Sequence, residues 1–437
     1  MKRLRLWILL LVPLLSARAR AQTDTLLQTT ADMERQAIER EASDASDDPS
    51  LQVRVKGFLD TYHAVRTEGK ADWMASRTRA RGEVTLEKGP ASLFLSLNAT
   101  YNALLNDRTG LELREAYLSY AKGNVDLRVG RQIIVWGVAD ALCITDCVSP
   151  MDYTEFLAQD YDDIRIPVNA LRVRYTWRSL TLEAVCIPVG AFGILPTDPH
   201  NPWALRPTAT SLPYTIDLES GRPAKRLANM EFGGRLTLNL SGLDLSLSGL
   251  RTWNKMPVVA AHIADDGRSL RVDGLYRRMT MIGADCALPI GRFVLRGETA
   301  CYFDEPQEAT VDMDVLRSNV LHALIGIDWF PGHDWNVSAQ YAHRHLTGRP
   351  DNATVYRNTG LATARIGKEL LRNTLKLSTF AYIDVTNGGV FNRFSAAYAL
   401  NDQIELTAGY DFFHADKGKF AAYGKNSEAW VKLKYSF

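Results

Sequence analysis

The 437-residue sequence has few of the features that mark enzymes, metalloproteins or helical membrane proteins. It contains only five cysteines, and an odd number cannot form a complete disulfide framework. No group of cysteines and histidines has the spacing of a zinc site, and no nucleophile motif of the G-x-S-x-G kind occurs. After the first 21 residues no run approaches about 18 consecutive apolar residues, which excludes a membrane-spanning helix.

The sequence also lacks a strong excess of either charge. Residues 1–21 carry five basic residues and no acidic residue, so the remaining chain has 46 basic and 50 acidic residues, a net charge of −4. A general binder of polyanions needs a basic surface, so nucleic acid is not an expected partner. No motif indicates a cofactor.

A secretory signal peptide is expected at the N-terminus, over residues 1–21. Lys2, Arg3 and Arg5 precede an apolar run at positions 6–15, and Ala19-Arg20-Ala21 forms a cleavage site. The alternative, a retained membrane anchor, needs a longer apolar run than this one. A secreted chain without a spanning helix is either soluble or a β-barrel.

Residues 22–50 form an acidic leader that differs from everything after it. Eight acidic residues stand against two arginines in this segment, and its apolar positions make only a thin helical stripe. We expect a short helix or a disordered segment in the periplasm. It is either a solvated leader or an arm that binds a periplasmic partner.

From Leu51 to the end of the chain apolar residues recur at every second position, which is the pattern of a β-strand. Short and long connections between these strands alternate strictly. The short turns lie at 87–90, 121–124, 177–179, 240–242, 288–291, 330–333, 370–373 and 400–402. The long connections lie at 67–72, 106–110, 136–167, 190–228, 255–270, 304–316, 347–353, 386–389 and 415–425.

These connections separate about 18 strands, with 16 to 18 as the expected range. An even strand count with turns of alternating length is typical of a transmembrane antiparallel up-and-down β-barrel with short periplasmic turns and long extracellular loops. A soluble β-sandwich would have shorter strands and fewer charges on its inner faces. The sequence therefore predicts an all-β barrel over residues 51–437, in contact with lipid in the outer membrane of a Gram-negative bacterium.

The last nine residues, AWVKLKYSF, support this prediction. Ala429, Val431 and Leu433 share one phase with Tyr435 and Phe437 and are expected to face lipid. The strand should close against residues 51–66, which removes an exposed sheet edge. We interpret Tyr435 and Phe437 as an assembly signal for the barrel-assembly machinery. Tryptophans near other strand ends, including Trp136 and Trp430, are typical of interfacial aromatic girdles.

Basic residues concentrate on the polar phase of several predicted strands. Arg77, Arg79 and Arg81 lie two residues apart, so all three project from one face. Arginine and lysine rings favour anions in a pore, whereas paired charges would instead form a structural ladder. The candidate substrate path comprises Arg54, Lys56, Arg77, Arg79, Arg81, Arg128, Arg131, Arg172 and Arg174.

Two connections are long enough to fold into the barrel and narrow it, 136–167 and 190–228. Cys143 and Cys147, in the first, are either free thiols or a disulfide that pins the loop tip. The carboxylates of Asp160, Asp162 and Asp163 form a weak candidate for a calcium site. A solvated or salt-bridged loop is the alternative for this acidic run.

One block, residues 111–153, resembles a known family. The segments Glu115-Ala116-Tyr117, Arg128-Val129-Gly130-Arg131-Gln132, Trp136-Gly137 and Ser149-Pro150-Met151-Asp152 look like those of a family of porin-like outer-membrane proteins that includes alginate-export channels. The resemblance implies an 18-stranded channel. Cys143 and Cys147 depart from the family pattern, so the resemblance does not identify a solute.

These observations predict a porin-like channel for passive passage of a small or polymeric solute, anionic or polyhydroxylated, gated by the two inward-folded loops. A channel for small hydrophobic molecules is one alternative. A hydrolase hosted by the barrel is another, and His343 and His345 on one strand are its best candidates for catalytic residues. The third alternative is a scaffold that binds periplasmic partners through residues 22–50.

Overall fold

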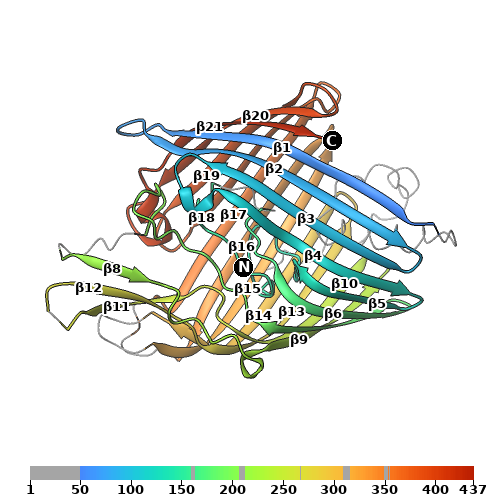
Figure 1. The fold of residues 1–437 in the computed structure, drawn as a ribbon, viewed down its shortest axis with the longest axis horizontal. Coiled ribbons are helices and arrows are strands. Elements are labelled where there is room, and N and C mark those ends of the chain that lie inside the picture. Colours follow the sequence, from blue (N-terminus) through green and yellow to red (C-terminus); the bar gives the residue numbers. More distant parts are fainter. Residues whose placement is uncertain are drawn as a thin grey trace, which may run out of the picture.

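The structure, a computed structural model, describes residues 50–158, 163–205, 212–265, 267–308, 315–348, 353 and 355–437. The predicted signal peptide and all but the last residue of the acidic leader lie outside these ranges. Eighteen strands form one antiparallel sheet that closes on itself, because β1 (Gln52–Arg66) pairs with both β2 and β21 (Figure 1). The predicted fold class is therefore confirmed.

The other strands of the barrel follow in chain order. They are β2 (Trp73–Lys88), β3 (Ala91–Asn102), β4 (Gly110–Lys122), β5 (Val125–Gln132), β6 (Val168–Trp177), β7 (Leu180–Val189), β9 (Glu231–Leu240), β10 (Leu243–Trp253), β13 (Arg278–Ile290), β14 (Phe293–Gln307), β15 (Leu316–Gly332), β16 (Trp335–Thr347), β17 (Asn358–Leu370), β18 (Leu375–Asp384), β19 (Val390–Ala399), β20 (Ile404–His414) and β21 (Glu428–Ser436). The predicted short turns and long connections all fall at the ends of these strands. The strand count predicted from the sequence is correct because each turn signal is local.

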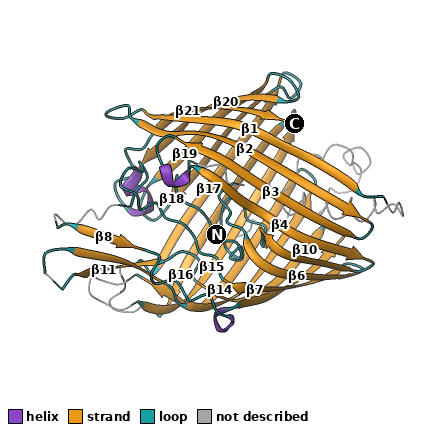
Figure 2. Ribbon diagram, in the orientation of Figure 1, coloured by secondary structure: helices purple, strands orange, loops and turns teal. Residues whose placement is uncertain are grey.

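The long connections gather at one end of the barrel, on the left in Figure 1. Two of them contain strands that the sequence analysis did not predict. β8 (Tyr214–Asp217) pairs in parallel with β12 (Leu270–Leu275), and β12 pairs with β11 (Val258–Ile263) to form a separate three-stranded sheet. The short 3-10 helices η1 (Asn106–Arg108), η2 (Leu227–Asn229) and η3 (Gly418–Tyr423) also lie in long connections (Figure 2). Among the described residues no helix is long and apolar enough to cross a membrane.

The two faces of the strands differ as the alternation predicts. On β21, Val431, Leu433 and Tyr435 are each about two-fifths exposed on the outer face, whereas Glu428 and Trp430 are buried on the inner face. The outer face is therefore apolar along this strand, as contact with lipid requires. Trp430 faces the lumen, where its Nε1 donates a hydrogen bond to Asp411 at 2.9 Å, so its assignment to an interfacial girdle is wrong.

The final residue completes the closure of the barrel. The backbone nitrogen of Gly57 donates to the carbonyl oxygen of Phe437 at 2.9 Å, and the backbone nitrogen of Phe437 donates to Gly57 at 3.0 Å. These bonds extend the pairing of β21 with β1 to the end of the chain. The predicted closure of the last strand against residues 51–66 is confirmed.

The buried apolar core lies inside the barrel rather than between two layers. It joins residues of the connection between β5 and β6, such as Ile134, Trp136 and Val148, to wall residues such as Met281 and Phe391. This connection, residues 133–167, is called the lumen loop below. Its predicted inward folding is confirmed, and it occupies the interior because its apolar side chains are buried there.

Candidate functional site

The lumen loop is held on one side by a single carboxylate, that of Glu298 on β14. Glu298 Oε1 accepts hydrogen bonds from the backbone nitrogen of Thr145 at 2.5 Å and from its hydroxyl at 2.6 Å. Glu298 Oε2 accepts from the backbone nitrogens of Val138 at 3.2 Å and Ala139 at 2.9 Å. Four donors of the loop therefore converge on one buried carboxylate, and such charge-assisted bonds are the strong ones.

Gly137 makes this arrangement sterically feasible. Its φ is +88°, a conformation that L side chains rarely adopt, and a Cβ at this position would lie 2.6 Å from Glu298 Oε1 and 2.7 Å from Thr145 Oγ1. The glycine in the Trp136-Gly137 segment thus leaves room for the carboxylate. Trp136 is buried beside it, with Nε1 donating to Glu183 at 2.7 Å, so its predicted interfacial position is also wrong.

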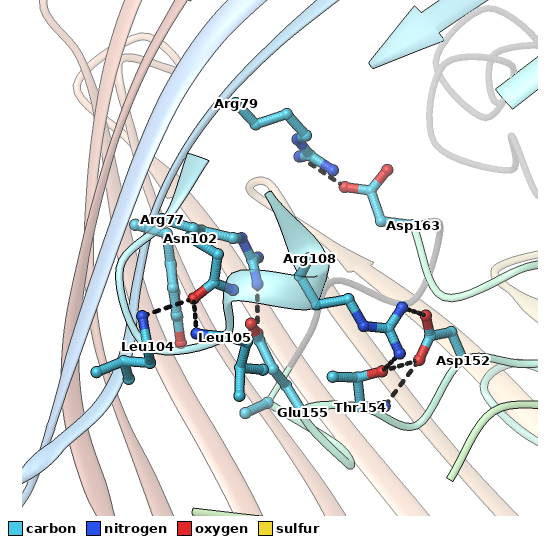
Figure 3. Close-up of polar contacts among 12 residues, drawn as sticks. Arg77, Arg79, Asn102, Leu104, Leu105, Arg108, Asp152, Thr154, Glu155 and Asp163 are labelled. Atoms are coloured by element: carbon cyan, nitrogen blue, oxygen red, sulfur yellow. Dashed lines mark hydrogen bonds and ion pairs between the residues drawn. The ribbon is translucent and has the colours of Figure 1, made fainter. Parts of the chain in front are cut away.

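Arginines of β2 hold the loop on the other side (Figure 3). Arg79 Nη2 lies 2.7 Å from Asp60 Oδ2 on β1 and 2.9 Å from Asp163 Oδ2 in the loop. Arg81 Nη2 contacts the other oxygen of Asp163, also at 2.9 Å. Arg77 forms an ion pair with Glu155. We call this set of five residues, without Asp60, the arginine clasp.

The electrostatics of the clasp favour an ionised Asp163. Burial by itself raises the pKa of the Asp163 carboxyl, but the positive charges of Arg79, Arg81 and Arg114 outweigh burial and lower this pKa below its usual value. The carboxylate therefore stays charged and bound at neutral pH.

Further polar contacts fix the fold of the loop between these anchors. Arg108 Nη1 lies 3.0 Å from Asp152 Oδ2, and Arg108 Nη2 donates to the hydroxyl of Thr154 at 2.6 Å (Figure 3). Inside the loop, Arg165 and the buried Asp146 form an ion pair. Loop and wall are thus connected by charged groups at several points, which restricts the loop to one position.

The second long connection, residues 190–230, packs on the lumen loop. The backbone nitrogen of Ile194 donates to the carbonyl oxygen of Met151 at 3.1 Å, and that of Tyr153 donates to Ile194 at 2.9 Å. Trp203 is almost completely buried, with its ring 6.3 Å from that of Phe156 in the lumen loop. The predicted inward folding of this second connection therefore holds for residues 190–205, whereas its later part lies elsewhere.

A cavity of about 980 Å³ lies between the lumen loop and the wall formed by β16 to β19. Apolar and aromatic side chains dominate its lining, and the polar exceptions include Arg365, Arg393 and Asp384. The apolar lining includes Leu142, Ile144, Phe156 and Leu157 of the lumen loop, Phe380, Tyr382 and Phe391 of the wall, Leu195 and Met256 of other connections, and Phe420 and Tyr423 of η3. A volume below about 1,000 Å³ with few polar groups is typical of a site for a small molecule.

Arg365 is the cation of this cavity with the most accessible side chain. Its guanidinium lies over the ring of Phe380 at 5.3 Å, and Nη1 is 3.3 Å from Asp140 Oδ2. The side chains of Arg365 and Asp140 are 40% and 32% exposed. Arg393, by contrast, is bound to Asp411 and to the carbonyl oxygen of Ala158. A solute anion can therefore reach Arg365 most directly.

The predicted substrate path does not form one open line of cations. Arg77, Arg79 and Arg81 bind the lumen loop, as described above. Arg128 and Arg172 are buried in the barrel wall, and Arg174 Nε bonds Glu183 at 2.5 Å. Most of these arginines follow the structural-ladder alternative.

The other members of the predicted path lie away from the loop. Arg54 pairs with Glu87, and Lys56 lies 3.2 Å from Glu83, both towards the short-turn end of the barrel. Arg131 shares the outward phase of Val129, and its Nε donates to the carbonyl oxygen of Leu113 at 2.9 Å. Its place on the lumen path is wrong, because Arg128 and Arg131 stand three residues apart on one strand.

The candidate disulfide is not formed, and the candidate calcium site lies partly outside the described residues. Cys143 is exposed and Cys147 is buried, and no bond joins their sulfur atoms. Of the three predicted calcium ligands, Asp160 and Asp162 lie outside the described residues, and Asp163 binds Arg79 and Arg81. The described residues contain no group of acidic, histidine or cysteine side chains suited to a metal ion.

The side chains of the two histidines proposed for a hydrolase point outward, although His343 is also among the residues that line the cavity. His343 and His345 share the outward phase of Tyr341, and both contact Oδ1 of Asn358, at 3.3 Å and 2.7 Å. The ring of His343 also contacts the hydroxyl of Tyr341 at 3.1 Å. Neither contact supplies a nucleophile in an enclosed site, so the arrangement gives no support to catalysis by this pair.

Sequence reasoning missed the groups that position the loop. Nothing in the sequence marks Glu298 as an acceptor for loop nitrogens, or Glu155 as the partner of Arg77. The available signal was the block 111–153, since its Trp136-Gly137 and Ser149-to-Asp152 segments supply the loop's turn and several of its contacts.

Solved structures with the same fold are outer-membrane proteins. A BenF-like porin from Pseudomonas fluorescens Pf-5 aligns with a TM-score of 0.52 and 8% identity, covering 90% of this chain and 98% of the porin. OccK8 (OprE) of Pseudomonas aeruginosa aligns with a TM-score of 0.51 and 9% identity, covering 88% of this chain and 98% of its own. At this identity the likeness shows a porin-like barrel, and no solute can be transferred from it.

Sequence comparison places the chain in a family without assigning an activity. No curated protein matches it. Residues 15–436 match the family described as "Protein of unknown function (DUF1302)", so the match spans nearly the whole sequence. The resemblance to alginate-export channels thus holds at the level of a porin-like barrel. This chain belongs to the DUF1302 family.

Proposed function

We propose that this chain is an outer-membrane channel of a Gram-negative bacterium that passes small amphipathic molecules with an apolar, preferably aromatic, body and an anionic group. The lumen cavity carries this proposal, because aromatic and aliphatic side chains surround it and Arg365 is accessible at its wall. The apolar outer face and the predicted signal peptide support the location. The narrowing of the lumen by two inward-folded loops supports a selective channel rather than an open pore.

This proposal joins two solute classes that the sequence left separate. The anionic group is retained because Arg365 can exchange Asp140 for a solute carboxylate, and both side chains are partly exposed. The apolar body is retained because the cavity offers many ring and aliphatic contacts. A polyhydroxylated solute has less support, since the arginines of β2 that would bind it already bind the lumen loop.

Solute flux into proteoliposomes tests the proposal. Phenylacetate serves as the aromatic anion and glucose as the polyhydroxylated probe, and planar-bilayer recording shows whether the barrel conducts. We expect phenylacetate to enter faster than glucose, and Arg365→Gln to lower phenylacetate flux on the order of tenfold, because one charge-assisted contact is lost. Phe380→Ala should reduce the same flux by removing a cavity wall.

The matched control is Lys376→Gln, which removes a cation from β18 at a position that does not line the cavity. It should leave phenylacetate flux unchanged. A barrel without conductance would contradict the channel itself. A conducting barrel in which glucose is preferred, or in which Arg365→Gln and Lys376→Gln behave alike, would contradict the solute class only.

A further inference from the structure

A group of cations lies on the outside of the barrel, at the long-loop end of β9, β10 and β13. Arg251 pairs in register with Thr280 and with Phe232, and the ring of Phe232 is 54% exposed on the outer face. Arg278 pairs with Trp253, two positions closer to the end of the strands. Because side chains of one phase share one face, both arginines project towards the lipid side rather than the lumen.

The connection before β9 folds down on this part of the wall. Arg278 Nη2 donates to the carbonyl oxygen of Ala228 at 3.1 Å, and its guanidinium lies over the ring of Trp253 at 5.0 Å. Trp253 Nε1 donates to the carbonyl oxygen of Asn229 at 3.2 Å. Arg226, three residues before Asn229, lines one small depression together with Trp253. We call Lys225, Arg226, Arg251 and Arg278 the outer basic patch.

The patch carries uncompensated positive charge, in contrast to the arginines of the lumen. No carboxylate of the described residues forms an ion pair with any of its four members. Arg251 donates to the hydroxyl of Thr280, and Arg278 donates to the carbonyl oxygen of Ala228. The acidic residues nearest in sequence to Lys225 and Arg226 on either side have other partners. Glu219 binds Arg222 at 3.1 Å, and Glu231 lies on the lumen side, where it binds Lys255 at 2.5 Å. The cationic side chains of the patch can therefore bind an anion from outside the protein.

Apolar groups beside the patch identify the kind of anion. Leu227, next to Arg226 in the sequence, is 70% exposed. Phe232, which pairs with Arg251 across β9 and β10, adds a second exposed apolar side chain. Trp253 is the last residue of β10, and tryptophan is enriched where strands reach a membrane interface. A ligand that meets both sets of groups must have an anionic head above a hydrocarbon body, which describes a lipid.

We propose that the outer basic patch binds the phosphate groups of a phosphorylated glycolipid of the lipid A type in the outer leaflet. Guanidinium groups bind phosphate bidentately, and cations near a charged lipid surface add to the affinity. This inference rests on the proposed function in one respect, since the patch meets outer-leaflet lipid only if the barrel spans the outer membrane with its long loops outside.

Native mass spectrometry of the full chain in detergent tests the inference. The probes are bisphosphorylated lipid A, monophosphorylated lipid A and phosphatidylethanolamine, at fixed ionic strength. We expect the first to bind most tightly. The double variant Arg251→Gln with Arg278→Gln should weaken its binding about 30-fold and remove the preference for two phosphates. Lys225→Gln with Arg226→Gln, two changes in the connection before β9, should also weaken binding of lipid A. The order of preference among the three lipids should stay the same.

The matched control is Lys88→Gln with Lys122→Gln, which removes the same charge at the short-turn end. If this control loses as much affinity as the patch variants, or if the patch variants bind lipid A normally, the inference is wrong. Planar-bilayer conductance of each preparation separates the two proposals. Conductance without lipid A selectivity refutes the inference alone, and lipid A selectivity without conductance refutes the proposed function alone.

Discussion

Glu298 of β14 and Thr145 of the lumen loop are joined by two hydrogen bonds, from the backbone nitrogen and from the hydroxyl of Thr145, although they are 153 residues apart. On the opposite side of the lumen, Arg79 of β2 binds Asp163 of the same loop. β2 and β14 are nine positions apart in the closed ring of 18 strands, counted in either direction. The lumen loop therefore crosses the full width of the barrel and is fastened at both walls.

Replacing Glu298 should release one end of the loop. Glu298→Ala removes the acceptor of four donors and is expected to destabilise the folded barrel by about 3 kcal/mol or more, because hydrogen bonds to a charged group are lost. Glu298→Gln keeps one acceptor and should cost less. Maleimide labelling of Cys147, in a background with the other four cysteines replaced by serine, reports the release, because Cys147 is buried beside the anchored segment.

The matched control for this experiment is Glu83→Gln, which removes a lumen carboxylate that binds Lys56 and not the loop. It should leave Cys147 protected. Rapid labelling of Cys147 in the protein that retains Glu298 would contradict the buried position of the loop. Unchanged protection of Cys147 in Glu298→Ala would contradict the role of Glu298.

Opening the arginine clasp should change the conductance of the channel. Asp163→Asn removes the charge that Arg79 and Arg81 share, so the loop should leave its position more often and single-channel conductance should rise or fluctuate. A double-mutant cycle with Arg79→Gln should show strong coupling, because both changes break the same contact. Arg54→Gln, in the exposed pair with Glu87, should behave as the native channel does. Additive effects of the two clasp variants would contradict a direct interaction.

The clasp should withstand mild acid. Burial favours the neutral form of Asp163, but its arginine neighbours lower its pKa below the usual value of about 3.9. Because the pKa in the folded state lies below that in the unfolded state, the stabilisation is complete above the unfolded value and is lost as the pH falls through the folded value. Protonation of Asp163 should therefore cause no change in conductance between neutral pH and about pH 4. A transition between pH 5 and 7 that depends on Asp163 would contradict this prediction.

Gly137→Ala should destabilise the barrel more than a glycine substitution that only strains the backbone. Both Gly137 and Gly69 have positive φ, at +88° and +79°, but only the Cβ at 137 would meet Glu298 and Thr145. Gly69→Ala should cost about 1 kcal/mol, and Gly137→Ala clearly more. Urea titration of both variants, followed by heat-modifiable migration, compares the losses. Equal losses would show that the close contact at Gly137 is unimportant.

The role of Phe437 as an assembly signal stays a prediction. Phe437→Ala preserves the backbone pairing with Gly57 and removes the aromatic ring, which is 59% exposed. We expect less folded barrel in the outer membrane, whereas the molecules that do assemble should conduct normally. Pulse-chase analysis of the folded fraction measures the first effect, and planar-bilayer recording measures the second. Normal assembly of the variant would contradict the proposed signal.

The sequence by itself determined the strands of the barrel, their number and their two faces. A period of two and the turn residues between strands are local properties, so AWVKLKYSF already separates Val431 and Leu433 on the lipid side from Lys432 and Lys434 on the lumen side. A glycine inside a predicted strand, as at Gly130, also marks a place where another part of the chain approaches closely. In the structure its φ is +134° and a Cβ would lie 2.3 Å from the carbonyl oxygen of Ala116.

Only the tertiary structure decided which charges meet and where the long loop lies. The arginines of β2 could have lined an open anion path, since their spacing is the same in both cases. The partners of these arginines, Glu155 and Asp163, are about 80 residues away in the sequence. Glu298 is 153 residues from Thr145, the loop residue that it binds. These contacts form only when the strands close into a ring and bring opposite walls to the same loop. The residue pattern of a single strand does not show which segment of the loop will lie against that strand.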